Sequence, residues 1–153
     1  MKEIEFGSQS ILVDENRTRD LYNLLTNRLP PIDWCQCDAC TNARITRRRF
    51  MPSTQVQLLR SLVLNPFAPL YSSGVRRYES ESRDFAWWRM MWFVYATMDN
   101  SKPSPRSVFE NKSVVWINDI ELPQEAYSRI NNYRILDPEG LVFVRASNAF
   151  PWL

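Results

Sequence analysis

The stretch FAWWRMMWFVYATM, residues 85–98, is the longest apolar run in the chain, and one charge, Arg89, interrupts it. With the two-residue period of a β-strand, both alternating sets of side chains are apolar. Such a strand is buried on both faces, as at the centre of a sheet. A buried helix of this length is the alternative, but aromatic and β-branched residues favour a strand. The sequence therefore predicts a central strand. Its two faces would hold Phe85, Trp87, Met91, Phe93 and Tyr95, and Ala86, Trp88, Met90, Trp92, Val94 and Ala96.

The N-terminal part predicts two strands and a helix. EIEF, residues 3–6, and ILV, residues 11–13, are separated by GSQS and have the composition of short strands in a hairpin or at a sheet edge. Asp14 has a side chain suited to cap the N-terminus of a helix over residues 15–29, where leucines recur at helical spacing.

A second helix is predicted over TQVQLLRSLVLN, residues 54–65, with Ser53 as its N-cap and the following NPFAP as its end. The next segment, residues 70–84, is polar. Gly74 within it indicates a turn, so we expect a loop there.

The C-terminal part completes the predicted fold. Residues 99–107, with two prolines, are typical of a loop, and residues 122–130 of a short helix or helical turn. SVVWI, residues 113–117, and GLVFVRA, residues 140–146, predict two further strands. Together these elements predict one α+β globular domain over residues 1–153, a mixed or antiparallel sheet with two or three helices packed on it.

Composition narrows the class of protein. Aromatic residues make up 13% of the chain, which indicates a folded globule. Only three glycines are present, which disfavours phosphate-binding loops. The sequence has no signal-peptide pattern and no apolar run long enough to span a membrane. An odd cysteine count disfavours a disulfide framework, so we expect a reducing, cytoplasmic location and no membrane partner.

All three cysteines lie in DWCQCDACTNARITRRRF, residues 33–50. Cys35, Cys37 and Cys40 could together bind zinc, but zinc takes four ligands, and the chain has no histidine and no fourth cysteine. Asp33, Asp38, water or a second chain would have to supply the fourth. A redox pair formed by Cys37 and Cys40 is another interpretation. The third is that the cysteines pack the start of a helix whose basic side faces outward.

Arginine outnumbers lysine by sixteen to three, and four arginines follow the cysteines directly. Arg44, Arg47, Arg48 and Arg49 could contact nucleic-acid phosphates or an acidic protein surface. The formal net charge of only +2 favours an acidic protein over a nucleic acid as the partner. The predicted partner-binding residues are Arg44, Arg47, Arg48, Arg49, Arg76 and Arg77.

Histidine is absent, which excludes triads and metal sites that require imidazole. The carboxylates of Glu79, Glu81 and Asp84 lie in a polar segment where solvation accounts for them. We therefore expect no enzymatic activity and no resident cofactor, with zinc as the one alternative.

Three motifs, CQCDACTNARI, WWRMMWFVYATM and FVRASNAFPWL, resemble those of a family of small, largely uncharacterised bacterial proteins. Members carry a cysteine cluster, a WxHFVG-like strand and a PWVL-like C-terminus. In this chain the histidine of that strand is replaced within residues 91–93 and its glycine by Ala96, which weakens a metal site. The resemblance implies a small stand-alone protein of the immunity or accessory-factor kind.

Two functions are predicted from these observations. The first is a non-enzymatic protein that binds and neutralises a macromolecule, as a toxin immunity protein or a phage-encoded inhibitor of host defence does. The alternative is a zinc-stabilised nucleic-acid-binding module that uses Cys35, Cys37 and Cys40 as ligands and the adjacent arginines on phosphates.

Overall fold

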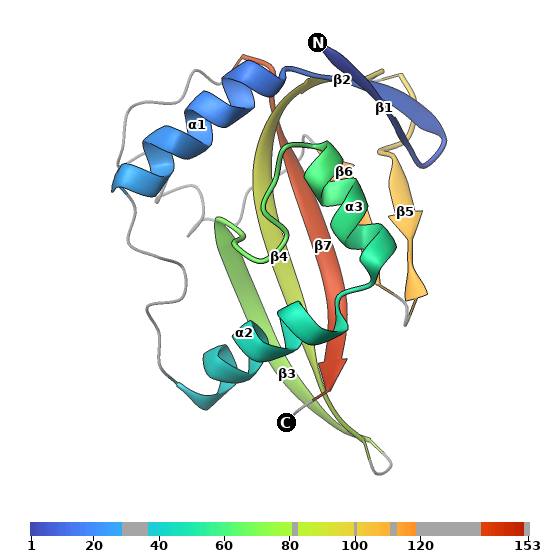
Figure 1. The fold of residues 1–153 in the computed structure, drawn as a ribbon. Coiled ribbons are helices and arrows are strands. Elements are labelled where there is room, and N and C mark those ends of the chain that lie inside the picture. The colour runs from blue at the N-terminus through green and yellow to red at the C-terminus, as the bar shows by residue number, and fades with distance from the viewer. Residues whose placement is uncertain (29–36, 81–82, 100, 111–112, 119–138, 152–153) are drawn as a thin grey trace.

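The computed structural model of this chain describes residues 1–28, 37–80, 83–99, 101–110, 113–118 and 139–151. The described residues form an α+β domain in which seven strands make one sheet and three helices pack on it, as predicted (Figure 1). The elements in chain order are β1 Lys2–Phe6, β2 Gln9–Val13, α1 Glu15–Arg28, α2 Asp38–Phe50, α3 Ser53–Ser61, β3 Tyr71–Ser80, β4 Arg83–Thr97, β5 Arg106–Val108, β6 Val114–Asn118 and β7 Leu141–Pro151.

All described strand pairs are antiparallel, in the order β1-β2-β4-β7-β6-β5, and β3 also pairs with β4. One edge of β4 is paired with β7 along residues 85–95. The other edge is shared, because β3 pairs with residues 83–91 and β2 with residues 96–97. The central position predicted for this strand is confirmed.

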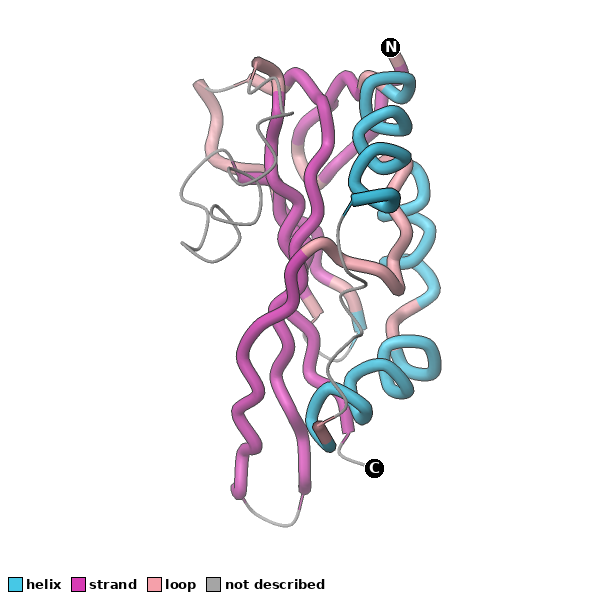
Figure 2. The backbone as a smooth tube through the Cα atoms, turned by 90° about the vertical axis from the view of Figure 1, so that its left-hand side faces the viewer, coloured by secondary structure: helices cyan, strands magenta, loops and turns pink. Residues whose placement is uncertain are grey.

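The two faces of β4 contribute to two apolar clusters, as its alternation predicts. Trp88, Met90, Trp92, Val94 and Ala96 belong to the main core, together with residues of α2 and α3. Figure 2 shows these two helices on one side of the strands. The opposite face of β4 contributes Met91, Phe93 and Tyr95, which pack with Phe143 of β7 and with Leu21 and Leu25 of α1, a helix that lies beside the edge of β4.

The predicted cap of α1 is confirmed. The backbone N–H of Arg17 donates to Asp14 Oδ1 at 3.1 Å, which satisfies one of the free amides of the first turn. The backbone N–H of Asp14 donates to the carbonyl oxygen of Tyr95 at 2.8 Å. The start of the helix is thereby fixed to the central strand.

The prediction for α3 was wrong at both ends. Pro52, not Ser53, occupies the N-cap position, and no side chain caps the helix there. The helix ends at Ser61, and Val63 has φ of 65°, which a β-branched residue adopts only at an energetic cost. Leu62 and Leu64 on either side are buried, so packing of these leucines stabilises this turn.

The loop predicted for residues 70–84 was also wrong, because residues 71–80 form β3. This segment lacks apolar alternation, and its strand geometry comes from backbone pairing with the long edge of β4. Gly74, predicted at a turn, lies in a β-bulge where the register shifts between Ser73 and Arg76.

The remaining strand predictions are confirmed: the strand predicted over residues 113–117 is shifted by one residue, and the others are longer than predicted. The strand predicted over residues 140–146 extends to Pro151, because residues 85–95 of β4 pair with residues 141–151. The loop predicted over residues 99–107 ends in β5. The short helix predicted over residues 122–130 lies outside the described residues. No described helix is long and apolar enough to cross a membrane.

Candidate functional site

The cysteine segment leads into α2, as predicted. Cys37 is the N-cap of this helix, and its Sγ accepts a hydrogen bond from the backbone N–H of Cys40 at 3.4 Å. Cys35 lies outside the described residues, so the three-cysteine zinc site stays a prediction, as does the redox pair. Within the described ranges, no three cysteine, aspartate or glutamate side chains are grouped closely enough to hold a metal ion.

The tertiary structure separates the arginines that follow the cysteines. Arg47 is only 4% exposed, and its Nη1 donates to the carbonyl oxygen of Phe67 at 3.2 Å. Its guanidinium therefore connects α2 to the segment after α3 and does not lie on the surface. Arg44 is half-buried, and its Nη2 donates to Thr41 Oγ1 at 3.0 Å.

Arg48 and Arg49 are exposed, and each guanidinium lies over an aromatic ring. Arg48 Cζ is 5.5 Å from the ring centroid of Phe67, and Arg49 Cζ is 5.6 Å from that of Phe50. Such contacts hold long side chains in place at a small gain in free energy. The side chains of Arg76 and Arg77 lie outside the described part of the structure.

Two large apolar side chains are exposed next to these arginines. Ile45 is 45% exposed and Phe50 is 39% exposed. Ile45 lies three and four residues before Arg48 and Arg49, a spacing that places them on one helix face. We refer to Ile45, Arg48, Arg49 and Phe50 as the α2 outer surface.

Part of this arrangement has a purely structural cause. The C-terminal turn of a helix carries a partial negative charge, and cations in that turn stabilise the helix. Arg47, Arg48 and Arg49 occupy the last turn of α2, so the helix dipole accounts for positive charge there. The helix dipole does not explain why Ile45 and Phe50 are left in water beside it.

A second group of arginines was not predicted as a site. Arg106, Trp116 and Arg145 are direct cross-strand neighbours on β5, β6 and β7. The adjacent row holds Val108, Val114, Ser147 and Arg89, the last on β4. Directly opposite residues of antiparallel strands project from the same face. We refer to these seven residues as the arginine–tryptophan face.

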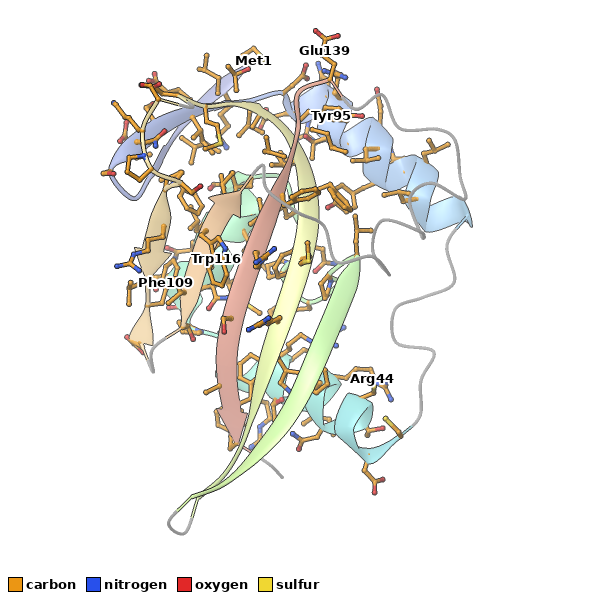
Figure 3. The ribbon with its side chains drawn as sticks, turned by 180° about the vertical axis from the view of Figure 1, so that it is seen from behind. Met1, Arg44, Tyr95, Phe109, Trp116 and Glu139 are labelled. Carbon is orange, nitrogen blue, oxygen red and sulfur yellow. The ribbon has the colours of Figure 1, made fainter. Side chains whose placement is uncertain are left out.

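The arginine–tryptophan face lies on the side of the sheet away from α2 and α3. Val115 and Ile117, which alternate with Trp116 along β6, are buried in the core beneath those helices. Figure 3 views the sheet from this side, with Trp116 on β6 and α2 behind the strands. Arg89, Arg106 and Val108 are exposed, whereas Trp116 and Arg145 are half-buried.

The charges on this face influence one another. Arg145 Cζ lies 5.6 Å from the ring centroid of Trp116. Burial lowers the pKa of the Arg145 guanidinium, and the positive charge of Arg89 lowers it further. The guanidinium groups of Arg89 and Arg145 thus lie close enough to repel each other on a partly buried surface.

A signal for this face was present in the sequence. Arg89 interrupts an otherwise apolar strand. Arg145 likewise interrupts the apolar residues of VFVRA, residues 142–146. A charge retained at the centre of a sheet strand must reach solvent or a partner. The register that pairs the two strands, however, is not encoded in either strand alone.

Comparison with known proteins gave no match among protein-family models, curated proteins or solved structures. The resemblance carried by the three short sequence motifs therefore stays a prediction.

Proposed function

We propose that this protein acts by binding, without catalysis, and that it neutralises a partner protein by contacting an acidic surface on it. A toxin immunity protein and a phage-encoded inhibitor of host defence are the two concrete forms. The observation that supports the proposal is the α2 outer surface, in which exposed Ile45 and Phe50 flank the exposed Arg48 and Arg49.

The chemistry of this surface is that of an interface centre. Protein interfaces are enriched in arginine and in aromatic side chains, and a few such residues supply most of the binding free energy. Arg48 and Arg49 are already held over aromatic rings, so less side-chain entropy is lost when a carboxylate binds them. Ile45 and Phe50 would add the apolar contact that charge alone does not provide.

The hydrogen bonds that connect α2 to other segments also favour binding by contact. The Asn42 side-chain amide donates to the carbonyl oxygen of Pro151 at the end of β7, at 3.2 Å. Arg47 holds the other end of the helix to Phe67. A surface that is fixed before binding needs little reorganisation when the partner arrives.

Co-expression with the products of neighbouring genes tests the proposal. We expect one of them to form a stoichiometric complex with this protein in size-exclusion chromatography. The double variant Arg48→Glu/Arg49→Glu should abolish that complex, because it places carboxylates against an acidic surface.

The matched control is Arg19→Glu/Arg60→Glu, which makes the same change of charge at exposed positions of α1 and α3. This control should leave the complex intact, and both variants should keep the circular dichroism spectrum of the wild type. A complex that survives the α2 variant, or is lost equally in both, would contradict the proposal. So would the absence of any complex.

A further inference from the structure

The arginine–tryptophan face has a regular layout that a solvated sheet face does not require. Its first row runs Arg106, Trp116, Arg145 across β5, β6 and β7. Its second row runs Val108, Val114, Ser147, Arg89 across β5, β6, β7 and β4. With neighbouring strands about 4.8 Å apart, the four strands span about 14 Å, the width of a short extended peptide with its side chains.

Basic residues lie on both sides of an apolar group within this layout. Trp116, Val114 and Val108 form an apolar side over β5 and β6, and Val108 is 65% exposed. Arg145 and Arg89 form a basic side over β7 and β4, and Arg106 adds a third charge at the β5 end. An apolar centre with arginines around it is the usual composition of a protein-binding surface.

We infer that the arginine–tryptophan face is a second binding surface, and that its occupant is an acidic polypeptide segment that also carries apolar side chains. Carboxylates of the segment would contact Arg89, Arg106 and Arg145, while its apolar side chains would cover Val108, Val114 and Trp116. Charge complementarity identifies the occupant, since Arg89 and Arg106 are exposed cations at the β4 and β5 ends of the face, with Val108, Val114 and Trp116 beside them.

The composition of the face favours a polypeptide over a single-stranded nucleic acid. Nucleic-acid platforms stack successive bases on several aromatic rings. Among the side chains that the structure describes on this face, one is a tryptophan, and the guanidinium of Arg145 lies 5.6 Å from its ring centroid. Val108 and Val114 present branched aliphatic groups, which contact apolar side chains well and provide no surface for base stacking.

The inference does not depend on the α2 outer surface, because the two surfaces lie on opposite sides of the sheet and share no residue.

A fluorescein-labelled peptide of alternating glutamate and leucine is a suitable probe, and fluorescence anisotropy at low ionic strength measures its Kd. The same peptide with glutamine in place of glutamate is its charge-free control. A labelled oligothymidylate tests the nucleic-acid alternative.

We expect the full-length wild-type protein to bind the acidic peptide and not the glutamine peptide, more weakly as salt is added. Arg89→Gln/Arg106→Gln, both at exposed positions, should weaken binding by roughly fivefold or more. Arg145→Lys keeps the charge but loses the planar fork, and should weaken binding less than Arg145→Gln does.

The matched control Arg19→Gln/Arg60→Gln removes the same charge from exposed positions of α1 and α3 and should leave the peptide Kd unchanged. The inference fails if the acidic peptide does not bind, or if the sheet variant and this control weaken it equally. Tighter binding of oligothymidylate through Arg89 and Arg106 would also overturn it, in favour of nucleic acid. The result at α2 in the co-expression test is separate, so either proposal can fail alone.

Discussion

The hydroxyl of Tyr22 on α1 hydrogen-bonds both backbone groups of Phe93 on β4. It donates to the carbonyl oxygen of Phe93 at 2.9 Å and accepts from the N–H of Phe93 at 2.9 Å. Phe93 lies between the part of the β4 edge that pairs with β3 and the part that pairs with β2. In this interval, the Tyr22 hydroxyl takes the place of a neighbouring strand. Thr18 Oγ1 similarly accepts from the N–H of Tyr95 at 3.1 Å.

Tyr22→Phe should destabilise the protein by about 1–3 kcal/mol, because both backbone groups of Phe93 lose their hydrogen-bond partner while they stay buried. Urea unfolding followed by circular dichroism measures the change. Ser10→Ala, which removes an exposed hydrogen bond to Glu3, is the control and should change stability by less than about 0.5 kcal/mol. Equal stability of Tyr22→Phe and wild type would show that this edge does not need the hydroxyl.

Alkaline pH should reveal the same contact. Burial raises the pKa of the Tyr22 phenol well above its ordinary value of 10.0, and its hydrogen bond with Phe93 opposes this only in part. Below pH 10 the Tyr22 phenol keeps its proton in both the folded and the unfolded chain, so the contribution of its hydrogen bonds to stability is fully present. Above pH 10 the unfolded chain loses the proton first, and the free energy of unfolding falls by up to about 1.4 kcal/mol per pH unit.

The comparison that isolates this effect is wild type against Tyr22→Phe in urea titrations from neutral to alkaline pH. We expect the stability difference between them to shrink as the pH rises past 10. A difference that stays constant with pH would mean that Tyr22 titrates alike in the folded and unfolded chain.

A buried amide pair joins α3 to β7. Gln55 Nε2 donates to Asn148 Oδ1 at 2.9 Å, and Asn148 Nδ2 donates to Gln55 Oε1 at 2.8 Å and to Ser113 Oγ at 2.8 Å. Both amides are 0% exposed. Gln55→Met or Asn148→Leu alone should cost about 2–3 kcal/mol, because each leaves the other amide buried without its partner.

The double variant Gln55→Met/Asn148→Leu should cost clearly less than the sum of the two single variants, since it removes both halves of the pair. Thermal or urea unfolding of the four proteins closes this double-mutant cycle. Additive costs would show that the two amides do not act as a unit.

Gly7 has positive φ, and a side chain there would collide with β5. Its φ is 58°, and a Cβ would overlap the backbone oxygen of Arg106. Gly7→Ala should therefore destabilise the protein by about 2–4 kcal/mol, from backbone strain and from displacement of β5. Gly140 has φ of 78° with its nearest contact, Arg17 Nη1, at 3.6 Å, so Gly140→Ala should cost only about 1 kcal/mol. Equal losses in both variants would remove the role assigned to the Arg106 contact.

Purified protein should carry well below one zinc ion per chain, because the chain contains three cysteines and no histidine, whereas structural zinc takes four such ligands. Inductively coupled plasma mass spectrometry measures the content. Stoichiometric zinc that disappears in Cys37→Ser would instead support the zinc-binding module and the ligand set of Cys35, Cys37 and Cys40.

The local sequence pattern was sufficient to predict an element where the residues of that element carry the pattern themselves. The double apolar alternation of residues 85–98 gave the central strand and the sorting of Met90 to Ala96 between two clusters. The side chain of Asp14 gave the start of α1. Residues 71–80 contain no such pattern, and they form a strand because the edge of β4 is available to pair with them.

The candidate site was predicted only in part for a related reason. A run of arginines indicates positive charge, but helical rotation directs Arg47 inward to Phe67 and its neighbours Arg48 and Arg49 outward. Arg89, Arg106 and Arg145 are far apart in the chain, and they share one face only through the register of four strands.

The sequence by itself therefore determined the class of fold, the central strand, the first helix and the excess of arginine. Tertiary structure alone decided which arginines reach solvent and which of them lie together. The reason is physical: side-chain periodicity depends on each segment's own backbone, whereas cross-strand register and helix packing depend on contacts between segments distant in the chain.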